Sequence, residues 1–252
     1  MSTDPAVDRT WDHEVDLVIV GSGGGGMVAA LTAADAGMSA VVLEKRDLIG
    51  GSTAMSGGVV WIPANPLLAA DGIADSYEDA MAHFDAVVGD VGPCSSPERR
   101  ESFLTSGPEM VRFLQAQGVQ FERCDGYSDY YSDEPGGLAV GRSIEPEPWD
   151  GRQLGDLLPK LQPGLAAGVG LAVKTNEVRT LSHWNRSPKA FATATRVVLR
   201  TWAAKARGAK LLTNGAALIG QMLAVARDRG VEVWTDTPAT GLIVTGGRVV
   251  GV

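Results

Sequence analysis

The chain has 252 residues, of which 44% are hydrophobic and 21% charged. This length and composition suit one large globular domain or two small ones and exclude a disordered chain. The formal net charge of -8 excludes a protein that binds nucleic acid over its whole surface, because phosphate binding requires clustered Lys and Arg. Cys94 and Cys124 lack the spacing and neighbouring ligands of a metal site, so no metal is predicted. The acidic first sixteen residues and the lack of a long apolar run predict a cytoplasmic protein.

The first structural motif combines a strand, a glycine turn, a helix and a second strand. Residues 16–20 form a short β-branched run, typical of a strand that is buried on both faces of a parallel sheet. The glycine run 21–26 follows, and a helix is predicted over 27–36 that ends at Gly37. A second apolar strand spans 40–43. This order within a short stretch is the context of a dinucleotide-binding βαβ unit.

The glycines of this turn have the spacing Gly-x-Gly-x-x-Gly. Gly21, Gly23 and Gly26 permit a tight turn, a close approach of the backbone to a pyrophosphate, and packing of the helix against its strand. Because 32 residues are glycine, chance alone gives roughly half a match to this spacing, so the surrounding strand and helix carry the assignment. Glu44, at the end of the second strand, can accept two ribose hydroxyls and would repel a 2′-phosphate.

A second glycine cluster decides between NAD and FAD. The segments 50–53 and 56–58 place backbone amides and hydroxyls within one short loop, which suits the diphosphate and the flavin end of FAD. We therefore predict FAD as the cofactor. The predicted FAD-binding residues from the two glycine clusters and the strand-end acid are Gly21, Ser22, Gly23, Gly24, Gly26, Glu44, Gly50, Gly51, Ser52, Thr53, Ser56, Gly57 and Gly58.

The middle of the chain is predicted to be an insertion of helices and loops. Ser76 can cap a helix in which Asp79 lies three residues on. A longer helical stretch covers 98–117 and is expected to be interrupted at Gly107-Pro108. Residues 122–156 are loop-like.

A basic tract follows, since residues 178–227 contain nine Lys or Arg and no acid. We expect the basic helix within it, 189–210, to present a solvated face or to be attracted to an anionic membrane surface. Arg196, Arg200 and Arg207 lie mostly off its apolar face. The residues of that face, which recur at helical spacing, are Phe191, Thr195, Val198, Leu199, Trp202 and Ala206.

The end of the chain is predicted to return to the first sheet. A helix over 216–229 leads to a strand at 231–234, and two further strands, 240–245 and 248–252, flank a hairpin turn at Gly246-Gly247. The sheet therefore receives its third strand only after a long insertion.

The predicted fold class is α/β, a Rossmann-like FAD-binding domain with an inserted, largely helical segment. It is expected to be C-terminally incomplete, because the last strand runs to the final residue with no helix after it. The predicted parts are 1–66, with the βαβ unit and glycine loops, 67–213, with part of the substrate site, and 214–252, which returns to the FAD domain.

Several motifs resemble the FAD-binding half of the fumarate reductase and 3-ketosteroid dehydrogenase flavoprotein family. The matching segments are 18–26, 44–45, 50–58, 61–66, 86–90 and 237–252. The stretch from the second glycine loop to Pro66 is most similar to the 3-ketosteroid Δ1-dehydrogenase branch. The resemblance implies an FAD-dependent oxidoreductase that acts on an apolar, steroid-like substrate and passes electrons to an external acceptor. It also implies that Lys45 and the backbone of Ala239 belong to the FAD site.

Candidate catalytic groups are tyrosines, three of which lie together as Tyr127, Tyr130 and Tyr131. A phenol can donate to a ketone oxygen and, as phenolate, remove a carbon-bound proton. The resemblance implies that Tyr130, after Asp129, supports a base tyrosine while flavin N5 takes a hydride from the neighbouring carbon. The alternative is a surface loop whose tyrosines pack on the domain. The family's base tyrosine lies beyond the equivalent of Val252, so little turnover is expected from these 252 residues alone.

Two other functions stay open. One is reduction of an unsaturated carboxylate such as fumarate, for which Arg179, His183 and Arg186 could clamp the carboxylate. Without such a role, His13, His83 and His183 are expected to be isolated surface or core residues. The other is a non-catalytic FAD-binding fragment completed by a complementary C-terminal half.

Overall fold

The computed structural model describes residues 10–165, 167–168 and 170–252. Part of the acidic N-terminal segment considered above therefore lies outside the described residues. The strands are β1 Leu17–Val20, β2 Ala40–Leu43, β3 Val60–Trp61, β4 Phe121–Arg123, β5 Ser143–Pro146, β6 Trp149–Asp150, β7 Leu211–Leu212, β8 Glu232–Trp234, β9 Ile243–Thr245 and β10 Arg248–Gly251. The α-helices are α1 Gly24–Asp35, α2 Gly51–Met55, α3 Pro66–Ala70, α4 Tyr77–Val87, α5 Pro97–Ala116, α6 Thr175–Leu181, α7 Pro188–Ala206 and α8 Asn214–Asp228. The two 3₁₀ helices are η1 Pro93–Ser95 and η2 Gly151–Lys160.

The central sheet is parallel, with the strand order β1-β2-β8. Leu17 pairs with Ala40, and Val41 pairs with Glu232. The prediction that the sheet receives its third strand only near the end of the chain is thus confirmed. The prediction that β1 is buried on both faces was wrong, because its last residue, Val20, is 62% exposed.

The helix after the glycine turn begins at Gly24, three residues before the predicted start. Gly37, at φ +72°, follows it in the left-handed conformation that its position requires. The predicted break at Gly107-Pro108 was wrong, because α5 runs through both residues. Pro108 cannot donate a backbone hydrogen bond, but both it and Gly107 are buried, so packing of this part of α5 in the fold offsets the lost bond.

The predicted loop 122–156 contains more regular structure than expected. All four residues of β5 are buried, and β5 pairs antiparallel with both β3 and β4. The polar composition of the strand hid it, because its glutamate Glu145 is buried by accepting hydrogen bonds from the backbone of Thr175 and Asn176. The predicted hairpin is confirmed as β9–β10, with positive φ at both Gly246 and Gly247.

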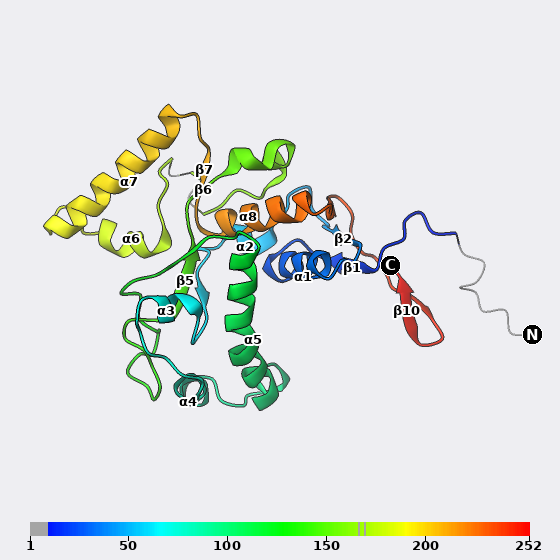
Figure 1. Ribbon diagram of the computed structural model, residues 1–252, viewed down its shortest axis with the longest axis horizontal. Helices are drawn as coiled ribbons and strands as arrows, with labels where there is room; N and C mark the ends of the chain where they lie inside the picture. The colour runs from blue at the N-terminus through cyan, green and yellow to red at the C-terminus, as the bar shows by residue number, and fades with distance from the viewer. Residues whose placement is uncertain (1–9, 166, 169) are drawn as a thin grey trace, which may run out of the picture.

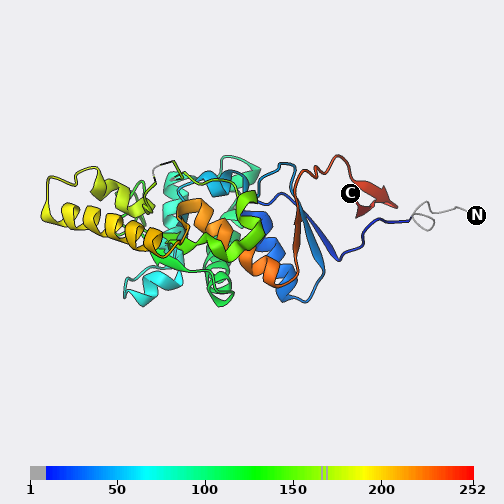
Figure 2. The same ribbon diagram turned by 90° about the horizontal axis from the view of Figure 1, so that it is seen from above.

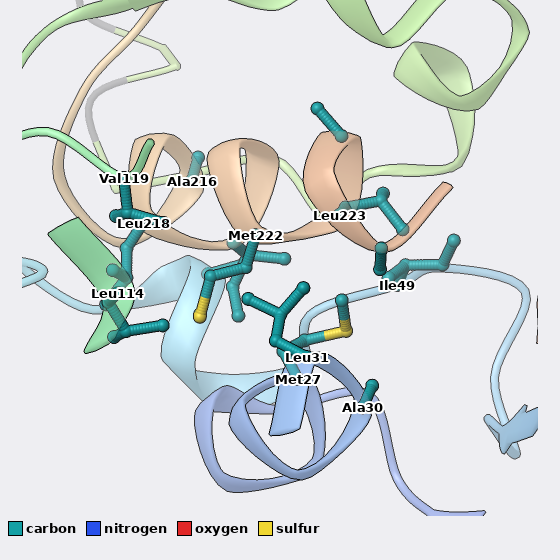
Figure 3. Packing of buried hydrophobic residues seen from close by; sticks show 14 of the residues in the cluster. Met27, Ala30, Leu31, Ile49, Leu114, Val119, Ala216, Leu218, Met222 and Leu223 are labelled. Carbon is teal, nitrogen blue, oxygen red and sulfur yellow. The ribbon is translucent and has the colours of Figure 1, made fainter. Parts of the chain in front are cut away.

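The hydrophobic core lies between α1 and α8 (Figure 3). Met27 and Leu31 of α1 pack beneath Met222 and Leu223 of α8, and Ile49 from the loop after β2 closes the layer. Each of these side chains contributes about 1.5–3 kcal/mol through burial. This packing fixes α8 beside the glycine turn, although the two are distant in the sequence.

The molecule is elongated in the view from above (Figure 2). The helices α6 and α7 lie at one end and the β9–β10 hairpin at the other (Figures 1 and 2). The boundaries proposed after residues 66 and 213 stay a prediction.

Candidate cofactor site

The first glycine turn connects β1 to α1, and its backbone packs closely against the start of α1. Gly21 has φ +95° and donates its N–H to the carbonyl of Leu43 at 2.8 Å, which ties the turn to β2. A Cβ atom at residue 26 would overlap the carbonyl oxygen of Gly21. Only glycine therefore fits at residue 26, as expected for the last glycine of a dinucleotide-binding turn.

The N-terminus of α1 faces the second glycine cluster. Gly24 donates its N–H to Thr53 Oγ1 at 3.0 Å, so a side chain from α2 caps α1. The first turn of α1 contains no acidic residue, and a Cβ at Gly25 would meet nothing within 4 Å. The positive end of α1 is thus accessible and not neutralised by its own residues, which fits a diphosphate.

Glu44 joins the two glycine clusters through Ser22. Its Oε2 accepts hydrogen bonds from the Ser22 N–H at 3.0 Å and from the Ser22 hydroxyl at 2.6 Å. Its Oε1 accepts one from the N–H of Arg46 at 3.0 Å. The Ser22 hydroxyl in turn accepts the N–H of Gly50 at 2.9 Å. Three segments predicted to bind one cofactor are therefore joined by direct contacts.

The Glu44 side chain is charged at neutral pH. Burial raises its pKa, but the hydrogen bonds from the Ser22 side chain and from the backbone of Arg46 and Ser22 outweigh burial, so the pKa lies below its usual range. A carboxylate that stays charged at the end of β2 suits a ribose hydroxyl.

Glu44 is also expected to make stability depend on pH. A carboxylate whose pKa is lower in the folded state stabilises the protein above its unfolded-state pKa, and this stabilisation is lost as pH falls through the folded-state pKa. We expect Glu44→Gln to lower the free energy of unfolding at pH 7, with a gap that narrows below about pH 4. Urea unfolding across this range measures the gap. Glu109→Gln, at an exposed site on α5, is the control, and a gap that widens in acid would contradict this role for Glu44.

The second glycine loop packs closely against the start of α8. A Cβ at Gly58 would approach the backbone carbon of Asn214 to 2.5 Å, and one at Gly215 would overlap the carbonyl of Thr53. Gly58 is thus required by packing between the loop and α8, whether or not it touches a ligand. The same helix keeps Thr53 in position to cap α1.

Side chains from distant segments fix the end of the same loop. Thr175 donates its hydroxyl to the carbonyl of Gly57 at 2.6 Å and accepts from Asn214 at 2.8 Å. Ser56 donates its hydroxyl to the Thr53 carbonyl and accepts the Gly58 N–H, so it stabilises the loop itself. Neither Thr175 nor Asn214 stands out in the sequence.

The segment after β8 runs alongside Glu44. Thr237 donates its N–H to the carbonyl of Glu44, and Asp236 donates its N–H to that of Arg46, both at 2.9 Å. Ala239, two residues on, is exposed and lines a cleft of about 570 Å³ together with Leu43. Lys45 is exposed at the same turn. Lys45 thus follows the strand-end acid directly, and Ala239 lies two residues after the contact of Thr237 with the Glu44 backbone.

Tyr130 is not brought into this arrangement. Its side chain is 92% exposed, its ring meets the ring of Tyr131 edge-on at 5.0 Å, and its hydroxyl makes no hydrogen bond within the described part of the chain. Arg179, His183 and Arg186, the candidate carboxylate clamp, are all exposed on or just after α6. Of the other histidines, His13 packs its ring against Trp234, and His83 is buried.

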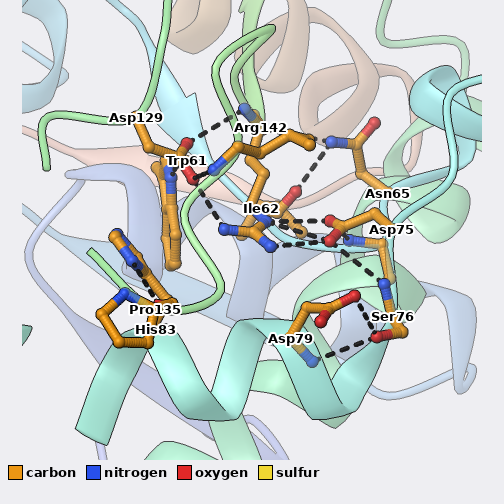
Figure 4. Close-up of polar contacts among 12 residues, drawn as sticks. Trp61, Ile62, Asn65, Asp75, Ser76, Asp79, His83, Asp129, Pro135 and Arg142 are labelled. Carbon is orange, nitrogen blue, oxygen red and sulfur yellow. Dashed lines mark hydrogen bonds and ion pairs between the residues drawn. The ribbon is translucent and has the colours of Figure 1, made fainter. Parts of the chain in front are cut away.

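A buried ion network next to Tyr130 had no signal in the sequence (Figure 4). Arg142, only 1% exposed, donates to Asp129 at 2.6 Å and to Asp75 at 2.7 Å. Asp129 also accepts the indole N–H of Trp61 at 2.8 Å, and the guanidinium carbon of Arg142 lies 5.8 Å from the Trp61 ring centroid. Burial by itself lowers the pKa of Arg142, but the two carboxylates raise it above its usual value. The network anchors the residue that precedes Tyr130.

The described residues offer neither a metal site nor a membrane span. They contain no group of three or more His, Cys, Asp or Glu side chains arranged to hold a metal ion. Within that part of the chain, no helix combines the length and apolar character needed to cross a bilayer.

The parallel sheet, the glycine turn into α1 and the acid at the end of β2 define a dinucleotide-binding protein of the Rossmann type. The sequence pattern of the FAD binding domain family matches residues 16–252. The chain belongs to this family, and its cofactor is FAD.

Several characterised proteins are similar over nearly the whole chain. The 3-oxosteroid 1-dehydrogenase of Mycolicibacterium smegmatis (strain ATCC 700084 / mc(2)155) is 41% identical over 95% of this chain and 42% of its own length. The 4-oxocyclohex-2-ene-1-carboxylate 5-dehydrogenase of Sinomonas cyclohexanicum is 34% identical over 90% of this chain and 39% of its own. The crystal structure of 3-ketosteroid delta1-dehydrogenase from Sterolibacterium denitrificans in complex with 1,4-androstadiene-3,17-dione superposes with a TM-score of 0.80 and 28% identity, covering 94% of this chain and 45% of that one. The chain thus spans less than half the length of these relatives.

Proposed function

We propose that this chain is the FAD-binding part of a dehydrogenase that introduces a carbon–carbon double bond beside the ketone of a 3-keto steroid. The observation that carries the proposal is the 41% identity to a 3-oxosteroid 1-dehydrogenase, which extends over 95% of the chain. The two glycine clusters and Glu44 support it, because hydrogen bonds join these segments, which are predicted to bind FAD, in one place.

The chain's own residues bind and orient the cofactor in this proposal. The amides at the start of α1 hold the diphosphate, Glu44 accepts one ribose hydroxyl, and the backbone of Ala239 contacts the adenine. The amides of the second glycine loop hold the flavin end. Ser22 holds the Glu44 carboxylate in position, and Ser56 stabilises the second glycine loop. When bound, FAD accepts a hydride and passes the electrons to an external acceptor.

The test uses the FAD-loaded protein as its source organism makes it. We expect a neutral 3-keto steroid to reduce an artificial electron acceptor, and fumarate not to be consumed with reduced viologen as donor. Fumarate reduction, or no dehydrogenation of the steroid by a protein that holds FAD, would overturn the proposal.

A second candidate substrate is a small cyclic keto acid, because a relative 34% identical to this chain is a dehydrogenase of an oxocyclohexene carboxylate. Charge distinguishes the two substrates, since a keto acid needs a cation in its site. The same assay with 4-oxocyclohexanecarboxylate decides between them. A higher kcat/KM for the acid than for the steroid would favour this second candidate.

Tyr130 remains our candidate catalytic residue, held at the loop position that the buried Asp129 anchors. In the steroid assay, Tyr130→Phe is expected to lower kcat by about tenfold to hundredfold, because the phenol no longer assists proton transfer. Tyr127→Phe, at an exposed site three residues earlier, is the matched control and should leave kcat nearly unchanged. Equal rates for the two variants would remove Tyr130 from the reaction.

A further inference from the structure

The peptide bond between residues 57 and 58 is held by hydrogen bonds on both sides. Its carbonyl, that of Gly57, accepts the hydroxyl of Thr175 at 2.6 Å. Its N–H, that of Gly58, donates to the hydroxyl oxygen of Ser56 at 3.0 Å. Two adjacent glycines give a chain unusual backbone freedom. Because the carbonyl and N–H of a peptide lie in one plane, these two contacts hold this part of the second glycine loop in one orientation.

Asn214 supports the same contact from the start of α8. Its side-chain amide donates to the Thr175 hydroxyl oxygen at 2.8 Å and lies 3.5 Å from the Gly57 carbonyl oxygen. The hydroxyl of Thr213 donates to the Asn214 side-chain carbonyl at 2.8 Å, which fixes the orientation of that amide. Asn214 is only 5% exposed. A buried side chain from α8 thus holds the Thr175 hydroxyl against the loop.

The backbone of Asn214 has an uncommon conformation. Its φ of +58° lies in the left-handed region, which asparagine tolerates better than most residues but glycine adopts most readily. A glycine there would fit the backbone and would lack the amide that reaches Thr175. Such conformations persist where the surrounding structure requires them, and they are common at functional sites. The asparagine therefore indicates a role for its side chain.

Glu145 fixes the backbone of Thr175. Its side chain is fully buried and accepts the N–H of Thr175 at 2.8 Å and that of Asn176 at 3.2 Å. It belongs to β5, which pairs with strands on both sides, so its position is well defined. Glu145 lies opposite Glu122 in the β4–β5 register, and Lys174 pairs with Glu122. The backbone of Thr175 is thus held by β5 while its hydroxyl reaches the loop.

We propose that Thr175, Asn214 and Glu145 are positioning residues of the FAD site, which hold the peptide between residues 57 and 58 in the orientation that FAD binding needs. The inference rests on the proposed assignment of the second glycine loop to the flavin end of FAD. Hydrogen bonds weaken steeply once the donor angle falls below about 120°, so a loop that rotates presents its amides poorly to a ligand. The three side chains act through the loop and not by touching FAD.

The test begins with the Thr175 hydroxyl, in the protein as its source organism makes it, freed of flavin and titrated with FAD. Thr175→Val keeps the branched shape and leaves the Gly57 carbonyl without its donor. We expect the Kd for FAD to rise about tenfold and the bands of the bound flavin to move toward those of free FAD. Thr175→Ser restores the hydroxyl, and its Kd should lie within about threefold of the parent's.

The control is Thr105→Val. Thr105 is exposed, and its hydroxyl donates only to carbonyls within α5. This variant should bind FAD like the parent. Circular dichroism without cofactor confirms that each titrated protein is folded.

Variants of the other two residues test whether they act by the same route. Asn214→Gly suits the left-handed backbone and removes the amide, so we expect the Kd to rise about threefold to tenfold. If Thr175→Val does not fold, this variant decides. Glu145→Gln keeps one acceptor oxygen for two N–H groups and should weaken binding about threefold. Thr175→Val/Asn214→Gly should bind FAD about as weakly as Thr175→Val, because both changes act through one carbonyl.

The outcomes separate this inference from the proposed function. A parent that binds FAD while the folded Thr175→Val or Asn214→Gly variant shows the same Kd and the same flavin bands would overturn the inference alone. Equal weakening by Thr175→Val and Thr175→Ser would also overturn it, because the hydroxyl would then have no part in binding. A folded parent that binds no FAD would overturn the proposed FAD site and the inference with it.

Discussion

Gly26→Ala is expected to destabilise the folded chain by about 3 kcal/mol and to abolish FAD binding, because the added methyl overlaps the carbonyl oxygen of Gly21. The methyl carbon is bonded directly to the backbone of residue 26, and the oxygen that it overlaps belongs to the backbone of Gly21. No flexible side chain can therefore move aside. To relieve the overlap, α1 must shift away from the sheet. That shift would displace the amides that face the diphosphate. Urea unfolding without cofactor and FAD titration measure the two effects separately.

The adjacent glycine provides the matched control. A Cβ at Gly25 meets nothing within 4 Å, and alanine is the better helix former by about 1 kcal/mol. Gly25→Ala should therefore be as stable as the parent or slightly more so. If Gly26→Ala unfolds at the same urea concentration as Gly25→Ala, the close packing described for this turn is wrong.

Arg142→Met is expected to cost about 3–5 kcal/mol of stability, because it leaves the buried carboxylates of Asp75 and Asp129 without their cation. The loss should be accompanied by a change in Trp61 fluorescence, since the indole donates to Asp129. Neutralising both acids in the triple variant Arg142→Met/Asp75→Asn/Asp129→Asn should restore part of the stability. Chemical unfolding at pH 7 measures the three proteins.

An exposed ion pair serves as control for this network. Arg229 and Asp35 form a pair at 3.1 Å, with side chains that are 35% and 51% exposed. Arg229→Met should cost less than about 1 kcal/mol. A similar loss for Arg142→Met and Arg229→Met would show that the buried network contributes no more than a surface contact.

The βαβ unit was predictable because its signals are local and agree with one another. An apolar strand, a glycine turn, a small-residue helix and a strand-end acid all lie within the first 44 residues, and the structure arranges them in that order. The long insertion before β8 was predictable for the same reason, since the helix and strand near the end of the chain have clear boundaries.

Contacts between distant segments account for what the sequence did not reveal. The continuous helix through Pro108 depends on burial of Gly107 and Pro108 in the fold, which overrides the local cost of proline. The pairing of Arg142 with Asp75 links residues 67 positions apart, and no spacing rule connects them. The cap that Thr53 gives to α1 likewise depends on packing of the second glycine loop against α8.

The central claim is that the two glycine clusters and Glu44 form one FAD site, and a titration with FAD followed by the visible spectrum tests it most directly. The purified 252-residue protein is expected to retain flavin after dialysis, with bands shifted from those of free FAD, and NAD is expected not to compete. A folded protein that shows no flavin bands after incubation with FAD would contradict it.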